Sequence, residues 1–294
     1  MPRHAIITGG SSGIGYATAQ RLVREGVNVS IIARSQSRLD AARDSLARSQ
    51  PQPNQPTGQP IAQRILALSA DVSDRLQAEQ AIQTAIAQLG APDWLITCAG
   101  ICHPGHFQDL PIEIFEQTMA INYFGSLYCV RAALPAMQQQ RQGKIALVSS
   151  GAGLIGLYGY TPYSPSKFAL RGLGEALRGE LKPWGIGVSV VYPPDTDTPQ
   201  LIAENQTKPE ATKRITATAK LWSADGVARE IIGGMAKNRF AIAPGSEMGV
   251  LSKFHSLLSP ALNWYFDRIV AETAGSAVTR TTLAASESRA HTPQ

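Results

Sequence analysis

Short apolar segments alternate with longer helical segments along most of this chain, and this alternation constrains the fold more than any other feature. Helical segments with regularly spaced apolar residues separate the apolar stretches. Strands alternating with helices form a parallel sheet that is covered on both faces. The sequence therefore predicts a doubly wound α/β fold with a seven-stranded parallel sheet. The expected strands, all rich in β-branched residues, are 4–9, 27–34, 64–71, 93–100, 144–150, 188–194 and 239–245.

The composition is that of a globular protein. Of 294 residues, 44% are hydrophobic and 17% charged, and the net charge of +5 comes from scattered basic residues. We therefore expect no nucleic-acid partner. The three cysteines form no disulfide or metal spacing, His103 and His106 lack further ligands, and no signal peptide is visible, so we predict no metal site and a cytoplasmic location. A proline-rich loop is predicted at residues 50–60.

A glycine-rich loop, TGGSSGIG, directly follows the first predicted strand and leads into a helix. Gly9, Gly13 and Gly15 have the spacing G-x-x-x-G-x-G. Glycine allows backbone N–H groups to approach a pyrophosphate at a helix N-terminus. Such loops also occur as plain connectors, but the place between strand and helix favours a dinucleotide site of the Rossmann type. Ser11, Ser12 and Ile14 complete the expected loop contacts.

The end of the second predicted strand indicates which nicotinamide cofactor is bound. An acidic residue there binds a ribose hydroxyl, whereas arginine accommodates a 2′-phosphate. Here Arg34 and Arg38 precede the first carboxylate, Asp40. We therefore predict NADPH, with Arg34 as a plain surface charge the alternative.

Two further strand ends are candidates for cofactor contacts. Asp71 and Val72 end the third predicted strand, and Ala99 and Gly100 end the fourth. Asp71 has two open roles, since its carboxylate can accept a hydrogen bond from an adenine amino group or cap the following helix. Small residues at 99 and 100 allow the backbone to pass close to a ribose.

Tyr163 and Lys167 are spaced i and i+4, so on a helix they share one face. A nearby ammonium stabilises a phenolate, and we expect Lys167 to lower the pKa of Tyr163 and to bond the nicotinamide ribose. Proline is tolerated in the first helical turn. Pro162 and Pro165 therefore place Tyr163 at the start of its helix.

Ser150 and Asn122 are weaker candidates for the same site. Ser150 ends the fifth predicted strand, where its hydroxyl is expected to hold a substrate carbonyl against Tyr163, and Ser149 competes for this role. Asn122 lies in a long predicted helix. It either kinks that helix or anchors a water relay to Lys167.

Taken together, TGGSSGIG, Asp71, the CAG turn, Asn122, Ser150 and Tyr163 with Lys167 resemble the short-chain dehydrogenase/reductase family over about residues 3–245. The resemblance implies that serine and tyrosine hold the carbonyl, tyrosine donates the proton, lysine lowers its pKa and asparagine holds a relay water. Cys98 stands where the family usually has asparagine. The loop of Pro193 and Pro194 replaces a Pro-Gly pair, and the resemblance places Pro193, Thr196 and Thr198 beside the nicotinamide.

The stretches YPPDTDTP and ENQTKPE are similar to a branch of the family that reduces a long-chain 3-keto-2-amino alcohol with NADPH. This resemblance implies a long-chain lipid ketone as substrate. Another hydrophobic ketone (steroid, retinoid or 3-oxoacyl) is an alternative, and so is a Rossmann protein that senses NADPH without turnover.

The C-terminal part has a different character. We expect residues 1–245 to form the catalytic domain, with 195–222 as a substrate lid, and 246–294 to form an amphipathic segment and a polar tail. Residues 247–270 are aromatic and mildly basic, and their uncharged runs are too short to span a bilayer. We expect this segment to contact either a membrane surface or a second subunit of a homo-oligomer.

Overall fold

The computed structural model describes residues 2–50, 63–217 and 219–290, with side chains described as far as residue 274. Most of the predicted loop at 50–60 and the last four residues of the predicted tail lie outside these ranges. The main sheet contains seven parallel strands in the order β3-β2-β1-β4-β5-β6-β9, which confirms the predicted sheet. The strands are β1 (His4–Thr8), β2 (Asn28–Ala33), β3 (Ile65–Ser69), β4 (Trp94–Thr97), β5 (Gly143–Val148), β6 (Ile186–Val191) and β9 (Ala241–Ile242).

The strand order reverses between β1 and β4, and this reversal positions the site. The chain runs outward from β1 to β3 and then returns to β4 on the other side of β1. Ligands of open parallel sheets bind at the carboxyl ends of the strands, where the order reverses. The glycine loop after β1 and the CAG turn after β4 meet there.

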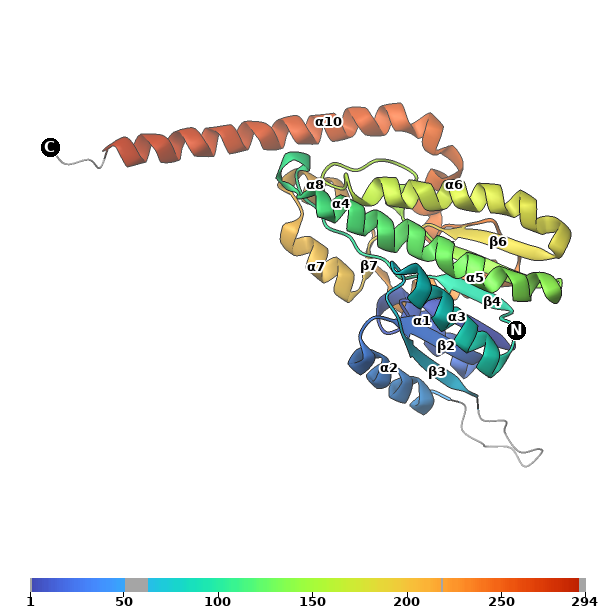
Figure 1. The fold of residues 1–294 in the computed structure, drawn as a ribbon. Helices are drawn as coiled ribbons and strands as arrows, with labels where there is room; N and C mark the ends of the chain where they lie inside the picture. Colours follow the sequence, from blue (N-terminus) through green and yellow to red (C-terminus); the bar gives the residue numbers. More distant parts are fainter. Residues whose placement is uncertain (1, 51–62, 218, 291–294) are drawn as a thin grey trace.

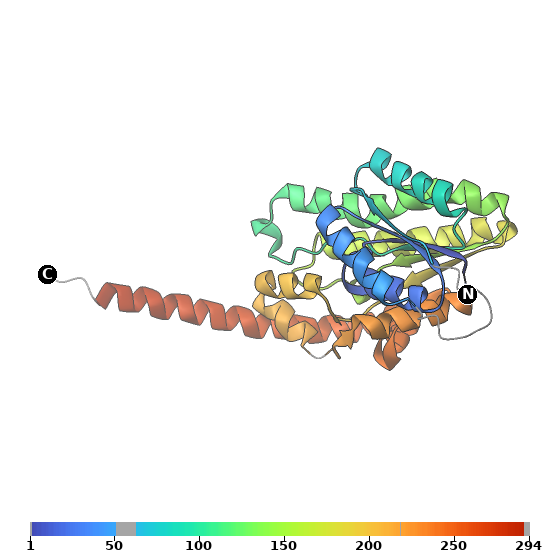
Figure 2. The same ribbon diagram turned by 90° about the horizontal axis from the view of Figure 1, so that it is seen from below.

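Helices cover both faces of the sheet (Figures 1 and 2). Neighbouring strand residues serve opposite faces, so Ile7 packs in one core and Ile6 in the other. The Ile7 core contains residues of α1 (Gly13–Arg24), α2 (Gln36–Arg48) and α9 (Ala224–Ala236). The Ile6 core contains residues of α3 (Arg75–Leu89), α5 (Gly125–Gln139) and α6 (Tyr163–Leu181).

The predicted lid contains α7 (Pro199–Thr207) and α8 (Glu210–Thr216). Its two ends are joined by a small parallel pair that the sequence analysis missed, β7 (Thr196–Asp197) and β8 (Trp222–Ser223). This pair fixes where the lid leaves and rejoins the main domain.

The C-terminal helix α10 (Gly245–Ala290) projects away from the body of the protein (Figures 1 and 2). Its backbone remains helical through residues 274–290, in the part where we expected a polar tail; alanine, the strongest helix former, occurs five times in that stretch. Ile269 of α10 is buried against Ala211 and Ile215 of α8, so the helix also supports the lid. In the described part of the chain, no helix combines the length and hydrophobicity needed to cross a bilayer.

Candidate active site

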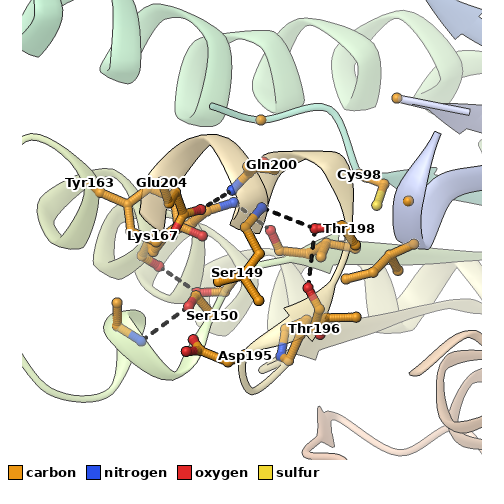
Figure 3. A pocket seen from close by; sticks show the side chains of 18 of the residues that line it. Cys98, Ser149, Ser150, Tyr163, Lys167, Asp195, Thr196, Thr198, Gln200 and Glu204 are labelled. Atoms are coloured by element: carbon orange, nitrogen blue, oxygen red, sulfur yellow. Dashed lines mark hydrogen bonds between the residues drawn. The ribbon is translucent and has the colours of Figure 1, made fainter. Parts of the chain in front are cut away.

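A cleft lies where the glycine loop, the ends of β4, β5 and β6, and α7 of the lid come together (Figure 3). It brings together most of the site residues expected from the sequence. Those that line it are Gly9, Ser12, Gly13, Ile14, Gly15, Ala99, Gly100, Ser150, Tyr163, Lys167, Pro193, Thr196 and Thr198. Ser11, Arg34, Arg38, Asp71, Val72 and Asn122 are not in the cleft lining.

The glycine loop has a geometry that suits a pyrophosphate. Gly9 and Gly13 have left-handed φ values of 66° and 54°. A Cβ on Gly9 would lie 2.9 Å from the backbone of Ala99, and one on Gly15 would lie 2.4 Å from the carbonyl oxygen of Gly9. Within the described residues, Ser12 at the N-cap makes no side-chain bond to the first turn of α1. The N–H groups of Gly13 and Ile14 are therefore available to an anion, whereas that of Gly15 bonds the Cys98 sulfur.

The end of β2 lies next to the glycine loop, and the end of β3 lies next to the end of β2. The Gly9 amide donates to the Ile32 carbonyl at 2.8 Å, and the Ser69 hydroxyl donates to the Arg34 carbonyl at 3.0 Å. Arg34 and Arg38 are exposed. Among the described residues, neither guanidinium has an ion-pair partner within 4.0 Å. Both charges are therefore free for an anionic group.

Asp71 does not cap the helix that follows it. That position belongs to Asp74, whose carboxylate accepts from the amides of Leu76 and Gln77. Asp71 instead accepts from the Ser73 amide at 2.9 Å and its hydroxyl at 2.6 Å. The sequence left two roles open for Asp71, and the structure excludes the role of helix cap. The neighbouring Val72 is buried in the core under α5, where it touches Gly125.

The CAG turn after β4 is held close to the catalytic candidates. The Thr8 hydroxyl accepts from the amides of Cys98 and Ala99, both at 3.1 Å. A Cβ on Gly100 would lie 3.2 Å from the Asn122 side-chain oxygen and 3.4 Å from the Lys167 ammonium, so the backbone of the turn passes close to both side chains. Burial raises the pKa of the Cys98 thiol to about 11, and this cysteine is a neutral residue of the cleft wall.

Tyr163 is the first residue of α6, as the flanking prolines predicted. The Lys167 ammonium lies 5.4 Å from the centre of the Tyr163 ring and donates to the Val148 carbonyl at 3.0 Å. Both side chains are buried, with exposures of 8% and 5%. The helix thus places the pair together in a dry part of the cleft.

The electrostatics of this pair differ from the sequence expectation. Burial is the main reason that the pKa of Tyr163 is raised well above its usual value, and Cys102 and Glu204 raise it further, while the hydrogen bond with Ser150 lowers it. We expected Lys167 to lower this pKa, and the net direction is the opposite because desolvation of the phenolate dominates. Burial also lowers the pKa of Lys167 to about 8, so its ammonium form predominates at neutral pH.

The two candidate serines have different surroundings. The Ser149 hydroxyl is buried and donates to the Lys167 carbonyl at 2.8 Å. The Ser150 hydroxyl accepts from the Ala152 amide at 3.2 Å and bonds the Tyr163 hydroxyl. The geometry favours Ser150 over Ser149 as the residue that faces a substrate.

Asn122 lies in a π-helical turn, η2 (Ala120–Phe124), between α4 (Ile112–Met119) and α5. Such turns interrupt helices and often occur at functional sites. The Asn122 side chain accepts from the Ile101 amide at 2.9 Å and donates to the Ile101 carbonyl and the Ser166 hydroxyl at 3.0 and 2.9 Å. Its amide therefore ties the CAG strand end to α6.

The loop after β6 carries the residues expected beside the nicotinamide. The Pro193 carbonyl accepts from the Gly151 amide at 3.1 Å. The Thr196 hydroxyl donates to Pro194 at 2.8 Å, and Thr198 caps α7 through the Leu201 amide. A Cβ on Gly13 would be 3.2 Å from Thr198, so this loop closes directly onto the glycine loop.

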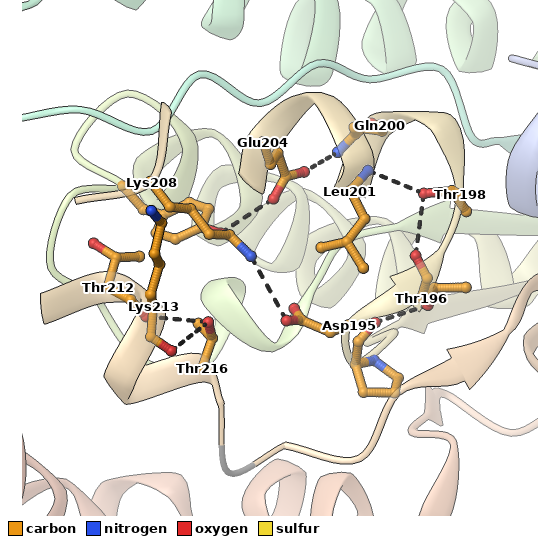
Figure 4. A network of polar contacts seen from close by, with 12 residues as sticks. Asp195, Thr196, Thr198, Gln200, Leu201, Glu204, Lys208, Thr212, Lys213 and Thr216 are labelled. Atoms are coloured by element: carbon orange, nitrogen blue, oxygen red, sulfur yellow. Dashed lines mark hydrogen bonds and ion pairs between the residues drawn. The ribbon is translucent and has the colours of Figure 1, made fainter. Parts of the chain in front are cut away.

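The lid contributes polar residues that sequence reasoning missed (Figures 3 and 4). Glu204 of α7 is buried and lines the cleft. Buried Lys208 places its ammonium 3.7 Å from an oxygen of Asp195, a residue that also lines the cleft. The polar, threonine-rich lid sequence indicated exposure, and only the tertiary contact of the lid with the cleft buries these charges.

An apolar groove continues from the cleft. It has a volume of about 600 Å³ and shares Ser150, Ala152 and Leu157 with the cleft. Its other walls come from α8 and α10 and are mainly hydrophobic. From α8 and α10 these walls include Ile215, Met248, Leu251, Leu258, Leu262 and Phe266, and Ile155 joins them from the segment after β5.

The family model for short chain dehydrogenases matches residues 3–209. The chain is 41% identical over 258 residues to 3-ketodihydrosphingosine reductase of Bos taurus, covering 87% of this chain and 75% of that protein. Against 3-ketodihydrosphingosine reductase of Dictyostelium discoideum, identity is 40% over 270 residues, with 90% and 80% coverage. The crystal structure of levodione reductase shares the fold, with a TM-score of 0.69 at 23% identity, covering 79% of this chain and 90% of the other. The chain therefore belongs to the short-chain dehydrogenase family, an oxidoreductase family that works with a nicotinamide cofactor.

Proposed function

We propose that this protein reduces 3-ketodihydrosphingosine to dihydrosphingosine with NADPH, as a step in making sphingolipids. The observation that carries the proposal is the continuity between a polar cleft holding Ser150, Tyr163 and Lys167 and an apolar groove formed with α10. A long-chain amino ketone has the same two parts. The relatives named 3-ketodihydrosphingosine reductase, at about 40% identity over most of the chain, support this substrate.

The proposed roles of the site residues follow from their surroundings. Ser150 and Tyr163 hold the carbonyl oxygen between their hydroxyls, and Tyr163 donates its proton to that oxygen. When bound, the nicotinamide supplies a hydride to the carbonyl carbon. Lys167 keeps its positive charge at neutral pH, given a pKa of about 8, and opposes the negative charge that develops on the tyrosine. Asn122 fixes the strand end beside Lys167.

NADPH is the proposed cofactor because of the charges at the end of β2. Arg34 and Arg38 offer two exposed guanidinium groups next to the loop that suits the pyrophosphate. A guanidinium binds a 2′-phosphate through charge-assisted hydrogen bonds. Ser11 and Ser12 add hydroxyl groups in the same loop.

The experiment that tests this function measures NADPH oxidation with detergent-dispersed 3-ketodihydrosphingosine, a short 3-oxoacyl thioester and a steroid ketone. Selective turnover of the sphingoid ketone would support the proposal. Turnover of only another ketone would contradict the proposed substrate and would leave the proposed mechanism of ketone reduction standing. No turnover of any ketone, together with tight NADPH binding, would favour a sensor of the cofactor.

We also propose that α10 contacts a lipid surface. Phe254, Leu257 and Trp264 follow helical spacing on a side of α10 that does not line the groove, with Leu257 79% and Trp264 66% exposed. The inner side of the same helix lines the groove, so a substrate leaving a membrane would have a short path to the site. Interfacial helices bind in this way through aromatic and aliphatic side chains.

Vesicle co-sedimentation tests this contact. The chain should pellet with vesicles that contain anionic lipid, and Leu257→Ser with Trp264→Ser should reduce the pelleted fraction without changing NADPH affinity. If the double variant pelleted with the vesicles as much as the wild type does, the proposal would be contradicted. A shift of the double variant from dimer to monomer, with no binding to vesicles, would show that a second copy covers this face instead.

A further inference from the structure

A carboxylate is buried on the substrate side of the cleft. Glu204 is the one buried residue of α7, a helix that the structure describes throughout. Its exposed fraction is 7%, and its side chain points into the cleft that holds Tyr163 (Figure 3). Burying a charge is costly unless it is paired, so this position needs a compensating group.

The partners of Glu204 in the protein are neutral. Its carboxylate accepts from the Tyr160 hydroxyl at 3.1 Å, from the Gln200 amide at 2.8 Å and from the Cys102 thiol. Among the described residues, no cationic nitrogen lies within the 4.0 Å of an ion pair. The nearby Lys208 is paired with Asp195 instead (Figure 4). The negative charge of Glu204 is solvated by hydrogen bonds but is not neutralised.

This charge opposes the proposed chemistry when nothing positive lies beside it. Glu204 is among the groups that raise the pKa of Tyr163, and a tyrosine that must give up a proton is a poorer acid next to an anion. A cation bound between the two would remove that disadvantage. The carboxylate therefore suits a substrate that brings its own positive charge.

We propose that Glu204 binds the ammonium group of an amino ketone substrate and thereby selects it over ketones that lack the amine. This inference rests on the proposed function, because the amino group of that substrate is on the carbon next to the carbonyl. A carbonyl held by Ser150 and Tyr163 puts the ammonium in the same cleft, beside α7. The hydrocarbon chain of the substrate then lies in the apolar groove lined by α8 and α10.

The test compares two ketones of equal chain length, 3-ketodihydrosphingosine and its counterpart without the amino group. Glu204→Gln keeps the size of the side chain and removes its charge. We expect this variant to lose about 30-fold or more in kcat/KM for the amino ketone, the usual effect of removing one partner of a buried charge pair. For the ketone without the amine, the loss should be less than about 3-fold.

Glu210→Gln is the matched control, since this glutamate is exposed at the start of α8 in the same lid. It should leave both ketones unaffected. NADPH affinity, measured for each variant, checks that the site is folded. Equal losses on both ketones in Glu204→Gln would overturn the inference and leave the proposed function standing. A wild-type protein inactive on the amino ketone but active on another ketone would overturn both.

Discussion

The cofactor side of the cleft and its substrate side are built in different ways. On the cofactor side, short motifs at the ends of neighbouring strands supply the contacts, and the sheet brings these strand ends together. On the substrate side, the walls come from α7, α8 and α10, which meet only through tertiary contacts such as Ile269 with Ile215. Chemistry is therefore encoded locally, whereas selection of the substrate depends on how distant segments pack.

This difference implies that the two sides respond differently to substitution. Changes at the strand ends should alter turnover or cofactor choice and leave the lid in place. Changes in the lid and α10 should alter the affinity for a lipid ketone and leave cofactor binding intact. Five substitutions test this division.

The largest effect is expected for Tyr163→Phe, which removes the proposed proton donor. General acid catalysis contributes about 100- to 10,000-fold, and we expect kcat to fall by about 1,000-fold, within that range. NADPH affinity, measured by fluorescence titration, should change little. A loss in kcat of less than about 2-fold would refute the role of Tyr163, because such a loss is far smaller than the contribution of a general acid.

Ser150→Ala should have the second-largest effect. We expect kcat to fall by about 100-fold, the lower end of the range for a group that acts on the reacting atoms. Ser149→Ala is its neighbour and control. It should lower stability by about 0.5–1.5 kcal/mol, because the buried Lys167 carbonyl loses one of its two donors and keeps the helical one, and should affect kcat much less. Steady-state kinetics and thermal unfolding of both variants decide the point. The opposite ranking of kcat would assign the substrate contact to Ser149.

Arg34→Ala should change the choice of cofactor. Hydrogen bonds to charged groups contribute about 1.5–3 kcal/mol, so NADPH affinity should fall by about 10- to 100-fold. NADH affinity should stay nearly the same, because NADH lacks the 2′-phosphate. Arg43→Ala on α2, where the arginine is paired with Asp44, is the control and should affect neither. Equal losses for NADPH and NADH in Arg34→Ala would exclude the phosphate contact.

Ile269→Ala tests the substrate side alone. The side chain is buried against α8, and such a truncation costs about 2–5 kcal/mol of packing. We expect a several-fold rise in KM for the long-chain ketone with NADPH affinity unchanged. Leu257→Ala, at an exposed position of the same helix, should leave KM for dispersed substrate unchanged. A parallel loss of NADPH affinity in Ile269→Ala would show that the two sides are not separable.

The last prediction concerns stability and not catalysis, and it is the pH dependence of unfolding through Lys167. Its pKa of about 8 in the folded protein is below the usual 10.5, so below pH 8 the folded state carries the full free-energy cost of the buried ammonium. That cost disappears as the pH rises toward 10.5. Wild-type stability, relative to Lys167→Met, should therefore rise by up to about 1.4 kcal/mol per pH unit in this window.

Denaturant unfolding at several pH values measures this difference. The comparison with the variant is needed because buried thiols and tyrosines such as Cys98 and Tyr163 titrate with the opposite sign. Lys182→Met is the control, since Lys182 is exposed just after the same helix. A pH-independent difference between wild type and Lys167→Met would mean that the pKa of Lys167 is not lowered.

The sequence predicts the sheet and the cofactor side well because strand periodicity, glycine spacing and the Tyr163 to Lys167 interval are local properties. Tyr163 begins its helix as Pro162 and Pro165 indicated. The direction of the Tyr163 pKa was wrong, because spacing shows that Lys167 is near and does not show how dry the cleft is.

The substrate side was less predictable. Glu204 and Lys208 look like ordinary surface charges in a polar segment, and only the docking of α7 onto the cleft buries them. The strand pair β7 and β8 has two residues in each strand, too few for a periodic pattern. The contact between α8 and α10 joins residues more than fifty positions apart, and no local signal marks it.

Transfer of a labelled hydride into the product tests directly whether this protein reduces the sphingoid ketone. The protein is incubated with 3-ketodihydrosphingosine and NADPH carrying deuterium at the transferred position of the nicotinamide, and the product is analysed by mass spectrometry. We expect dihydrosphingosine with one deuterium on the carbon that carried the ketone, and only a trace of this product with Tyr163→Phe. Absence of labelled dihydrosphingosine from the wild-type reaction would contradict it.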